Sequence, residues 1–190
     1  MIRLIAQTPD AWLETVLSEF NTFLNDHAAA EKKASGMAMS MALHFRDRER
    51  LVTEMIDLAI EELTHFRECV RLLHDRGLHL LADEKDEYVN QIRTQVRNGR
   101  DEGLLDRLLT GGIIEARGVE KFGMLATALP TGELKSFYEA ITRSEERHNT
   151  LFLDLAREYF PDPEIQQRLQ ELLEFEAELI ERLPIRPYLH

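Results

Sequence analysis

The chain has 190 residues and a mass of 22.1 kDa, which suits one domain with a sizeable core. Hydrophobic residues make up 44% and charged residues 31%, which excludes general disorder, and the single Cys69 excludes an internal disulfide framework. The sequence has no apolar run long enough to span a membrane, and its first ten residues lack the apolar core of a signal peptide. We therefore expect a cytoplasmic protein that does not bind membranes.

The net charge of −12 disfavours binding to nucleic acid, DNA included, through bulk electrostatics. The charge is uneven, because residues 162–181 contain seven acidic residues and one basic residue and so hold half of the total. By contrast, residues 90–100 contain Arg93, Arg97 and Arg100 and no acidic residue. A polyanionic partner is therefore disfavoured for the whole chain but not for this segment.

Capping and turn signals divide the chain into helices, and strand-like alternation is weak throughout. A helix pattern begins at Thr8–Asp10 and reaches about Phe45, with a candidate break near Asn25–Asp26. The later predicted helices are about Glu49–His74 with a stop at Gly77, a piece around Asp86–Arg97 inside the connection Leu78–Gly103, Leu104–Leu129, a helix from the Pro130–Gly132 stop to Tyr159, and Asp162–Leu183.

These elements predict an all-α fold of two helical hairpins, one long crossover and an extra C-terminal helix. One long crossover is the connectivity of ferritin-like four-helix bundles. We therefore expect a single ferritin-like domain over residues 1–190.

Each of the four long helices has an apolar core stripe with one glutamate near its middle, and two of them add a histidine three residues later. The six residues are Glu31, Glu62, His65, Glu115, Glu145 and His148. No Lys or Arg lies on these stripes to offset the cost of burying carboxylates, which is at least several kcal/mol for each unpaired one. Two dications would supply the missing positive charge.

The spacing of these residues favours a dinuclear metal site. On a helix, positions i and i+3 share one face, so each Glu-x-x-His can direct a carboxylate and an imidazole at one ion. The halves match, because Glu31 precedes Glu62 by 31 residues and Glu115 precedes Glu145 by 30. Oxygen and nitrogen ligands without thiolate favour iron or manganese over structural zinc. The alternatives are protonated carboxylates, or a register that leaves the glutamates in solvent, which the adjacent Glu61 and Glu146 keep open.

Three other features have competing explanations. His27, one turn before Glu31, is interpreted as a core or boundary histidine rather than an extra ligand. Cys69 falls on a core stripe and is most simply a small buried hydrophobic residue. Gly111 and Gly112 would each cost a helix about 1 kcal/mol relative to Ala, which indicates close helix packing or an opening that admits substrate.

Three parts of the chain carry a family resemblance. They are Asp26–Ser35, Ala59–Phe66, and Gly112–Phe122 followed by Arg143–His148. These segments resemble the tRNA 2-methylthio-N6-isopentenyladenosine hydroxylase family, and the resemblance spans nearly the whole chain. Members are non-haem di-iron monooxygenases that hydroxylate the isopentenyl side chain of the modified adenosine next to the anticodon. The resemblance implies that the six residues named above hold two iron ions, with O2 as co-substrate and no catalytic residue beyond the metal ligands.

The resemblance also implies two partners. Electrons must come from a separate reductase or ferredoxin, because the sequence has no Rossmann glycine motif and no iron–sulfur cysteines. The tRNA anticodon loop needs only stacking and a small basic footprint, for which Arg93, Arg97 and Arg100 are the first candidates. Ordinary solvated arginines paired with acidic residues are the alternative explanation. An iron-storage or peroxide-reducing ferritin-like protein and a metal-free helical interaction module are the competing functions.

Overall fold

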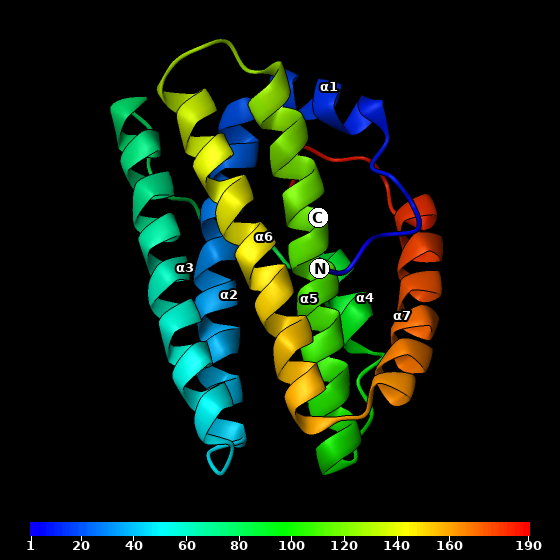
Figure 1. Ribbon diagram of the computed structural model, residues 1–190. Helices are drawn as coiled ribbons and strands as arrows, with labels where there is room; N and C mark the ends of the chain where they lie inside the picture. Colours follow the sequence, from blue (N-terminus) through cyan, green and yellow to red (C-terminus); the bar gives the residue numbers. More distant parts are fainter. The chain divides into compact units, whose positions relative to one another are not determined.

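The computed structural model describes all 190 residues, and the chain is all-α, with seven helices and no strand (Figure 1). The helices are α1 (Asp10–Ser18), α2 (Phe20–His44), α3 (Glu49–Asp75), α4 (Glu87–Arg93), α5 (Arg100–Ala128), α6 (Glu133–Tyr159) and α7 (Asp162–Arg182). None of them is long and apolar enough to cross a membrane. The chain forms two compact units, residues 14–84 with 186–189, and residues 1–13 with 85–185 and 190.

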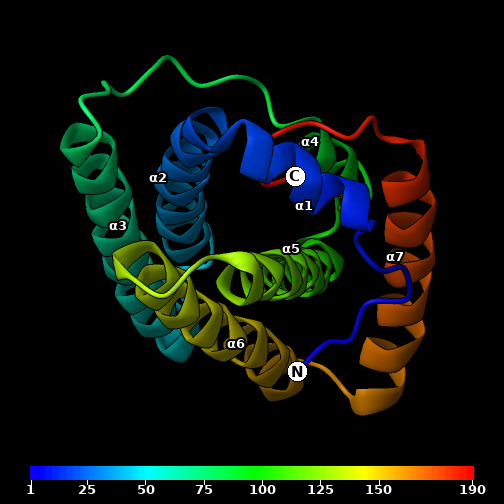
Figure 2. The same ribbon diagram turned by 90° about the horizontal axis from the view of Figure 1, so that it is seen from above.

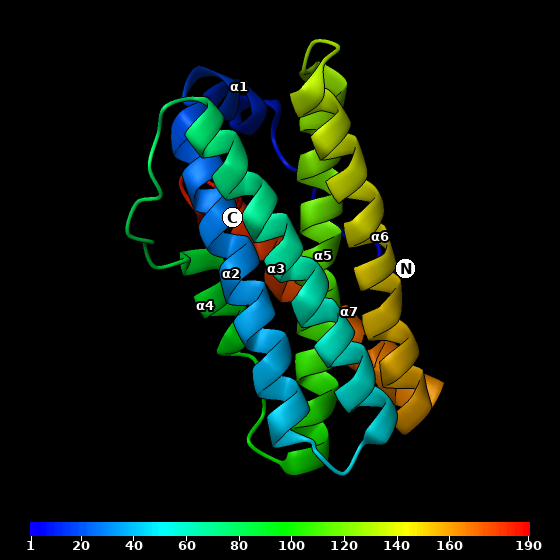
Figure 3. The same ribbon diagram turned by 90° about the vertical axis from the view of Figure 1, so that its left-hand side faces the viewer.

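The first unit is built on the hairpin of α2 and α3, which lie side by side (Figure 3). The Ser35 hydroxyl of α2 donates a hydrogen bond of 2.9 Å to the Ala59 carbonyl of α3. At the end of α3, Gly77 adopts a φ of 70°, and the next amide, Leu78 N–H, bonds back to the Leu73 carbonyl. This Schellman-type cap needs a residue without Cβ strain, so the predicted helix stop at Gly77 is confirmed.

The second unit is built on the hairpin of α5 and α6, with α4 and α7 packed beside α5 (Figure 2). A Cβ atom at Gly111 would lie 2.8 Å from the Phe152 ring, and one at Gly112 would lie 2.7 Å from the Ile2 side chain. The Asn149 amide fixes the same contact by donating to the Gly112 carbonyl at 3.1 Å. Of the two explanations for the glycine pair, close packing is therefore the one that the structure supports.

The first long helical stretch is interrupted at Glu19, not near Asn25–Asp26 as predicted. Glu19 has a φ of −125° and a ψ of 41°, which separates α1 from α2. The polar side chains that suggested a break accept hydrogen bonds from distant backbone amides instead: Asn25 from Leu81 at 2.9 Å and Asp26 from Leu189 at 2.7 Å. Their side chains are thus used for tertiary contacts, and the helix continues past them.

The segment between α4 and α5 also differs from prediction. The short helix ends at Arg93 rather than Arg97, because the chain turns so that the Arg97 amide can donate to the Asp106 carboxylate at 2.8 Å. Helix α5 then begins at Arg100, one turn before the predicted Leu104. Gly103 is therefore helical, and a Cβ atom there would lie 2.9 Å from the Arg97 carbonyl oxygen.

Candidate metal centre

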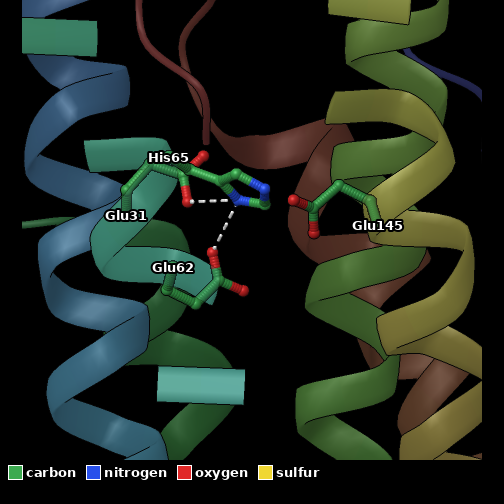
Figure 4. A group of neighbouring side chains, drawn as sticks. All are labelled: Glu31, Glu62, His65 and Glu145. Atoms are coloured by element: carbon green, nitrogen blue, oxygen red, sulfur yellow. Dashed lines mark hydrogen bonds and ion pairs between the residues drawn. The ribbon is translucent and has the colours of Figure 1, made fainter. Parts of the chain in front are cut away.

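The α2–α3 hairpin brings together the three ligand candidates of the first unit, Glu31, Glu62 and His65. Both carboxylates are buried, and the ligand atoms of the three residues lie within 4.8 Å of one another. His65 Nδ1 lies 3.2 Å from Glu62 Oε2 and 3.5 Å from Glu31 Oε2 (Figure 4). The i, i+3 spacing places Glu62 and His65 on one face of α3, and the adjacent turn of α2 contributes Glu31, so this one hairpin builds the whole triad.

The charges of this triad depend strongly on one another. Burial alone would raise the pKa of Glu31, but hydrogen bonds from His27 and His65 outweigh it and lower that pKa to about 2. Burial alone would lower the pKa of His65, but its hydrogen bonds to Glu31 and Glu62 raise it to about 10. A proton on His65 thus provides positive charge beside the two carboxylates, and a metal cation would provide it in the proton's place.

His27 is a further member of this group. It is fully buried on α2, and its Nε2 lies 2.6 Å from Glu31 Oε1. Because an ionised carboxylate only accepts hydrogen bonds, Nε2–H is the donor, and Nδ1 lies 3.4 Å from the Cys69 thiol. Burial raises the pKa of that thiol well above its ordinary value. His27 is therefore a core histidine, as predicted, but its position orients one oxygen of Glu31.

The α5–α6 hairpin supplies the matching triad of the second unit, Glu115, Glu145 and His148. All three are buried, and their ligand atoms lie within 4.8 Å of one another. His148 Nδ1 lies 3.5 Å from Glu145 Oε2, while its Nε2 lies 3.5 Å from the Ser144 hydroxyl. The burial of all four predicted glutamates is confirmed, and the alternative of solvated carboxylates is wrong.

Each hairpin therefore presents two buried carboxylates and one imidazole, contributed by one glutamate and one Glu-x-x-His. Such a donor set matches a hard or borderline divalent cation with oxygen and nitrogen ligands.

The three arginines proposed for tRNA contact lie in different environments. Arg93 is exposed at the end of α4, and Arg100 is exposed at the start of α5. Arg97 donates from Nε and Nη2 to Asp106, each at 2.9 Å, and Asp106 also accepts from Arg168 at 2.8 Å. Arg97 thus forms the structural ion pair that the alternative explanation describes.

One buried ionic contact was missed by the sequence analysis. Arg117 is fully buried two residues after Glu115, and its Nη2 donates to Glu176 of α7 at 2.7 Å. Tyr88 of α4 donates to the same carboxylate at 2.9 Å. Glu176 lies in the acidic last helix, three or four residues from Leu172, Leu173 and Leu179. This helical spacing from leucines was the only local sign that Glu176 faces the interior. The contact ties α4 and α7 to the helix that carries Glu115.

Comparison with solved structures defines the class of protein. The chain matches the structure described as "Protein 43 with aldehyde deformylating oxygenase activity from Synechococcus" with a TM-score of 0.94 and 33% sequence identity. The match covers 100% of this chain and 96% of that chain. The fold is therefore ferritin-like, of the class that holds di-iron sites, and the fold prediction is confirmed.

Sequence comparisons define the family. The family model described as tRNA-(MS[2]IO[6]A)-hydroxylase (MiaE) matches residues 2–190. The tRNA 2-(methylsulfanyl)-N(6)-isopentenyladenosine(37) hydroxylase of Pseudomonas putida is 36% identical over 174 residues, 92% of this chain and 84% of that protein. The Salmonella typhimurium protein of the same name is 32% identical over 155 residues, 82% of this chain and 56% of that protein. The chain belongs to this tRNA hydroxylase family, as its resemblance predicted.

Proposed function

We propose that this chain hydroxylates the isopentenyl side chain of 2-methylthio-N6-isopentenyladenosine next to the tRNA anticodon. One oxygen atom of O2 is inserted into an allylic C–H bond, and the other leaves as water with two electrons and two protons supplied from outside. The observation that carries the proposal is the buried carboxylate–histidine triad on each hairpin of a chain that matches the hydroxylase family from residue 2 to residue 190.

Two iron ions are the proposed cofactor, held by the two triads together: Glu31, Glu62, His65, Glu115, Glu145 and His148. Bound iron would supply the activation of O2, which no protein side chain provides. The chain itself provides ligand geometry and an environment without bulk water. His27 contributes by holding one oxygen of Glu31, which leaves the other oxygen to face His65.

The remaining requirements of this reaction are proposals as well. A separate reductase or ferredoxin supplies the electrons, the six ligands belong to one domain over residues 1–190, and the enzyme works in the cytoplasm. The anticodon loop is proposed to contact Arg93 and Arg100, which are exposed. We retain Arg97 in the proposed footprint, although its guanidinium is bound to Asp106.

The tRNA footprint predicts a selective loss of affinity. Replacing Arg93 and Arg100 together with Ala should weaken tRNA binding about tenfold, because each removed contact to phosphate costs on the order of a factor of a few. Gel-shift titration at fixed salt measures this loss, and the iron content of the same samples should be unchanged. Arg107→Ala, a change at an exposed arginine of α5, is the control. Equal affinities of the double variant and the wild type would contradict the footprint.

The decisive experiment is a nucleoside assay on iron-loaded protein. The protein is incubated with tRNA that carries the unhydroxylated nucleoside, isotopically labelled O2 and dithionite, and the digested nucleosides are analysed by mass spectrometry. We expect one labelled oxygen in the isopentenyl group and no product from Glu145→Gln, whereas Glu146→Gln, an exposed neighbour, should keep activity. Absence of product from the wild type would refute the proposal.

A second candidate function is oxygen chemistry on an aldehyde. The observation that favours it is the 33% identity to the Synechococcus protein, whose description names aldehyde deformylating oxygenase activity. The same protein preparation tested with an aldehyde and with tRNA distinguishes the two substrates. The family match and the two curated relatives favour tRNA.

A further inference from the structure

Five large apolar side chains are exposed on the α2–α3 hairpin, and we call this set the outer apolar face. The exposed fractions are 40% for Met39, 70% for Leu43, 39% for Ile56, 59% for Ile60 and 51% for Leu63. They make up nearly half of the large exposed hydrophobic residues of the whole chain. Spacings of three or four residues place them in one stripe on each helix.

The two stripes lie on the same outer side of the hairpin. On α2, successive steps of four residues turn from Glu31 through Ser35 to Met39 and Leu43, about 40° each. On α3, steps of three residues turn from Glu62 through Ala59 to Ile56, about 60° each. The Ser35 hydroxyl is hydrogen-bonded to the Ala59 carbonyl, which marks where the two helices touch. On each helix the turn that leads from the ligand side to this contact therefore continues to the outer side of the hairpin, where the apolar residues lie.

The size of the face indicates what kind of partner it fits. The exposed fractions correspond to an apolar area on the order of 400 Å², which is large enough to be functional in a soluble protein. Paired with an equal area of a partner, it would bury about 800 Å², within the range below about 1,200 Å² that transient redox encounters use. Permanent homodimers bury about 2,000 Å² or more, so a second copy of this chain fits the face less well.

The charge around the face also selects among partners. Arg67, whose side chain is 72% exposed, continues the α3 stripe one turn beyond Leu63, and its Nε lies 3.7 Å from Glu68 Oε1. The acidic residues Glu54, Glu61 and Glu68 recur every seven residues, about 100° or more around α3 from the stripe, and the exposed Glu49 lies on the stripe seven residues before Ile56. The α3 stripe thus carries one acidic and one basic residue, so in a chain with a net charge of −12 an acidic protein meets less repulsion here than over the surface as a whole.

The face also lies close to the proposed metal ligands. Ile60 and Leu63 belong to the same turns of α3 as Glu62 and His65, but point to the other side of the helix. The thickness of one helix, about 10 Å, therefore separates the outer face from the ligand side. A redox group brought to this surface would be only a short distance from iron.

We propose that the outer apolar face is the docking site for a small acidic iron–sulfur protein that delivers single electrons to the proposed di-iron centre. This inference rests on the proposed function, because that hydroxylation consumes two external electrons in each turnover. The chain has one cysteine, so it cannot bind an iron–sulfur cluster through cysteines of its own.

The test compares two sources of electrons for the same iron-loaded variant. In Leu43→Glu with Ile60→Glu, carboxylates replace the two most exposed residues of the face, one on each helix. The protein donor is a plant-type [2Fe–2S] ferredoxin kept reduced by NADPH and its reductase, and the chemical donor is dithionite. The rate at which each donor bleaches the ferric absorption of the centre is measured by stopped flow. Ile185→Glu, an exposed residue outside the face, is the control.

We expect the double variant to be reduced by ferredoxin roughly tenfold more slowly, through a higher ferredoxin KM, and by dithionite at the wild-type rate. Failure of ferredoxin to reduce the wild type, unchanged ferredoxin reduction in the variant, or an equal loss with dithionite would each overturn the proposal. Sedimentation of the wild type as a dimer that the double variant abolishes would assign the face to a second copy instead.

These results are separable from failure of the proposed function. Reduction of the iron centre is measured without tRNA, so the docking result stands even if no nucleoside is hydroxylated. If dithionite drives hydroxylation and ferredoxin does not reduce the centre, the function survives and the docking proposal fails.

Discussion

At the scale of single residues, His27 connects the packing of α2 with the chemistry of Glu31. It is fully buried, and its bond to Glu31 Oε1 fixes the side chain that presents Oε2 toward His65. Replacing His27 with Leu should weaken metal binding roughly 10- to 100-fold, which is the usual cost of removing a group that orients a ligand. Titration with Co(II), followed by visible absorption, measures the affinity.

Two companion variants make this prediction specific. His27→Gln keeps a donor and should recover part of the lost affinity, while Cys69→Ala removes only a weak thiol contact and should change little. Thermal unfolding of each variant shows whether the fold is intact. If His27→Leu folds normally and binds Co(II) as tightly as the wild type, His27 has no role at the site.

Which side-chain environments could be predicted from the sequence depended on how far apart the interacting residues lie along the chain. The burial of Glu62 and His65 follows from local helical periodicity, so it was predictable. The Arg117–Glu176 ion pair joins residues 59 positions apart, and no local pattern shows which arginine meets which glutamate. Sequence likewise indicated that His27 is internal, but not that its partner is Glu31.

At the scale of helical elements, two glycines should respond oppositely to the same substitution. Gly36→Ala on α2 meets nothing within 4 Å and should raise the free energy of unfolding by about 1 kcal/mol. Gly111→Ala on α5 would press a Cβ atom against the rigid Phe152 ring. Its overpacking cost of about 1–3 kcal/mol exceeds the helical gain, so stability should fall. Urea unfolding tests both, and stabilisation by Gly111→Ala would contradict the packing explanation.

The two ion pairs of Asp106, with Arg97 and with Arg168, should make stability depend on pH. Burial would raise the pKa of Asp106, but hydrogen bonds from Arg97 and Arg168 outweigh it and lower that pKa. A lowered folded-state pKa stabilises the fold above the unfolded value, about 3.9, and this stabilisation disappears as pH falls through the folded value. Asp106→Asn should therefore cost about 2–3 kcal/mol at pH 7 and progressively less below about pH 4.

Urea unfolding at several pH values measures the difference between wild type and Asp106→Asn. Asp154→Asn is the matched control, because Asp154 pairs with Arg157 at 3.7 Å with both side chains about half exposed. Such a surface pair contributes about 0–1 kcal/mol. A deficit of Asp106→Asn that is as large at pH 3 as at pH 7 would show that charge is not its source.

Some helix boundaries could be predicted from local sequence signals, as the burial of Glu62 and His65 could, and others could not. The ends at Gly77 and before Glu133 were predictable, because glycine and proline act on their own backbone. The break at Glu19 was not, because no side-chain cap marks it, and neither was the start of α5 at Arg100, because the turn before it depends on the Arg97 amide bonding to Asp106, nine residues further on. Asn25 and Asp26 show the converse case, in which polar side chains typical of breaks serve distant amides.

At the scale of the whole molecule, metal binding should be coupled to stability, because a chain of charge −12 buries the carboxylates of all four proposed glutamate ligands. A ligand at about 100 times its Kd adds about 2.7 kcal/mol, which for a chain of this size raises Tm by about 5–10 °C. We expect this rise on loading metal-free protein with anaerobic Fe(II), and its loss in Glu62→Gln and Glu145→Gln.

The neighbours Glu61 and Glu146 provide controls of identical chemistry, because Glu61→Gln and Glu146→Gln change charge without removing a proposed ligand. Differential scanning fluorimetry of all five proteins, with and without Fe(II), gives the comparison. If the control variants lose the metal-dependent rise as fully as the ligand variants, stabilisation comes from general charge neutralisation and not from the six proposed ligands.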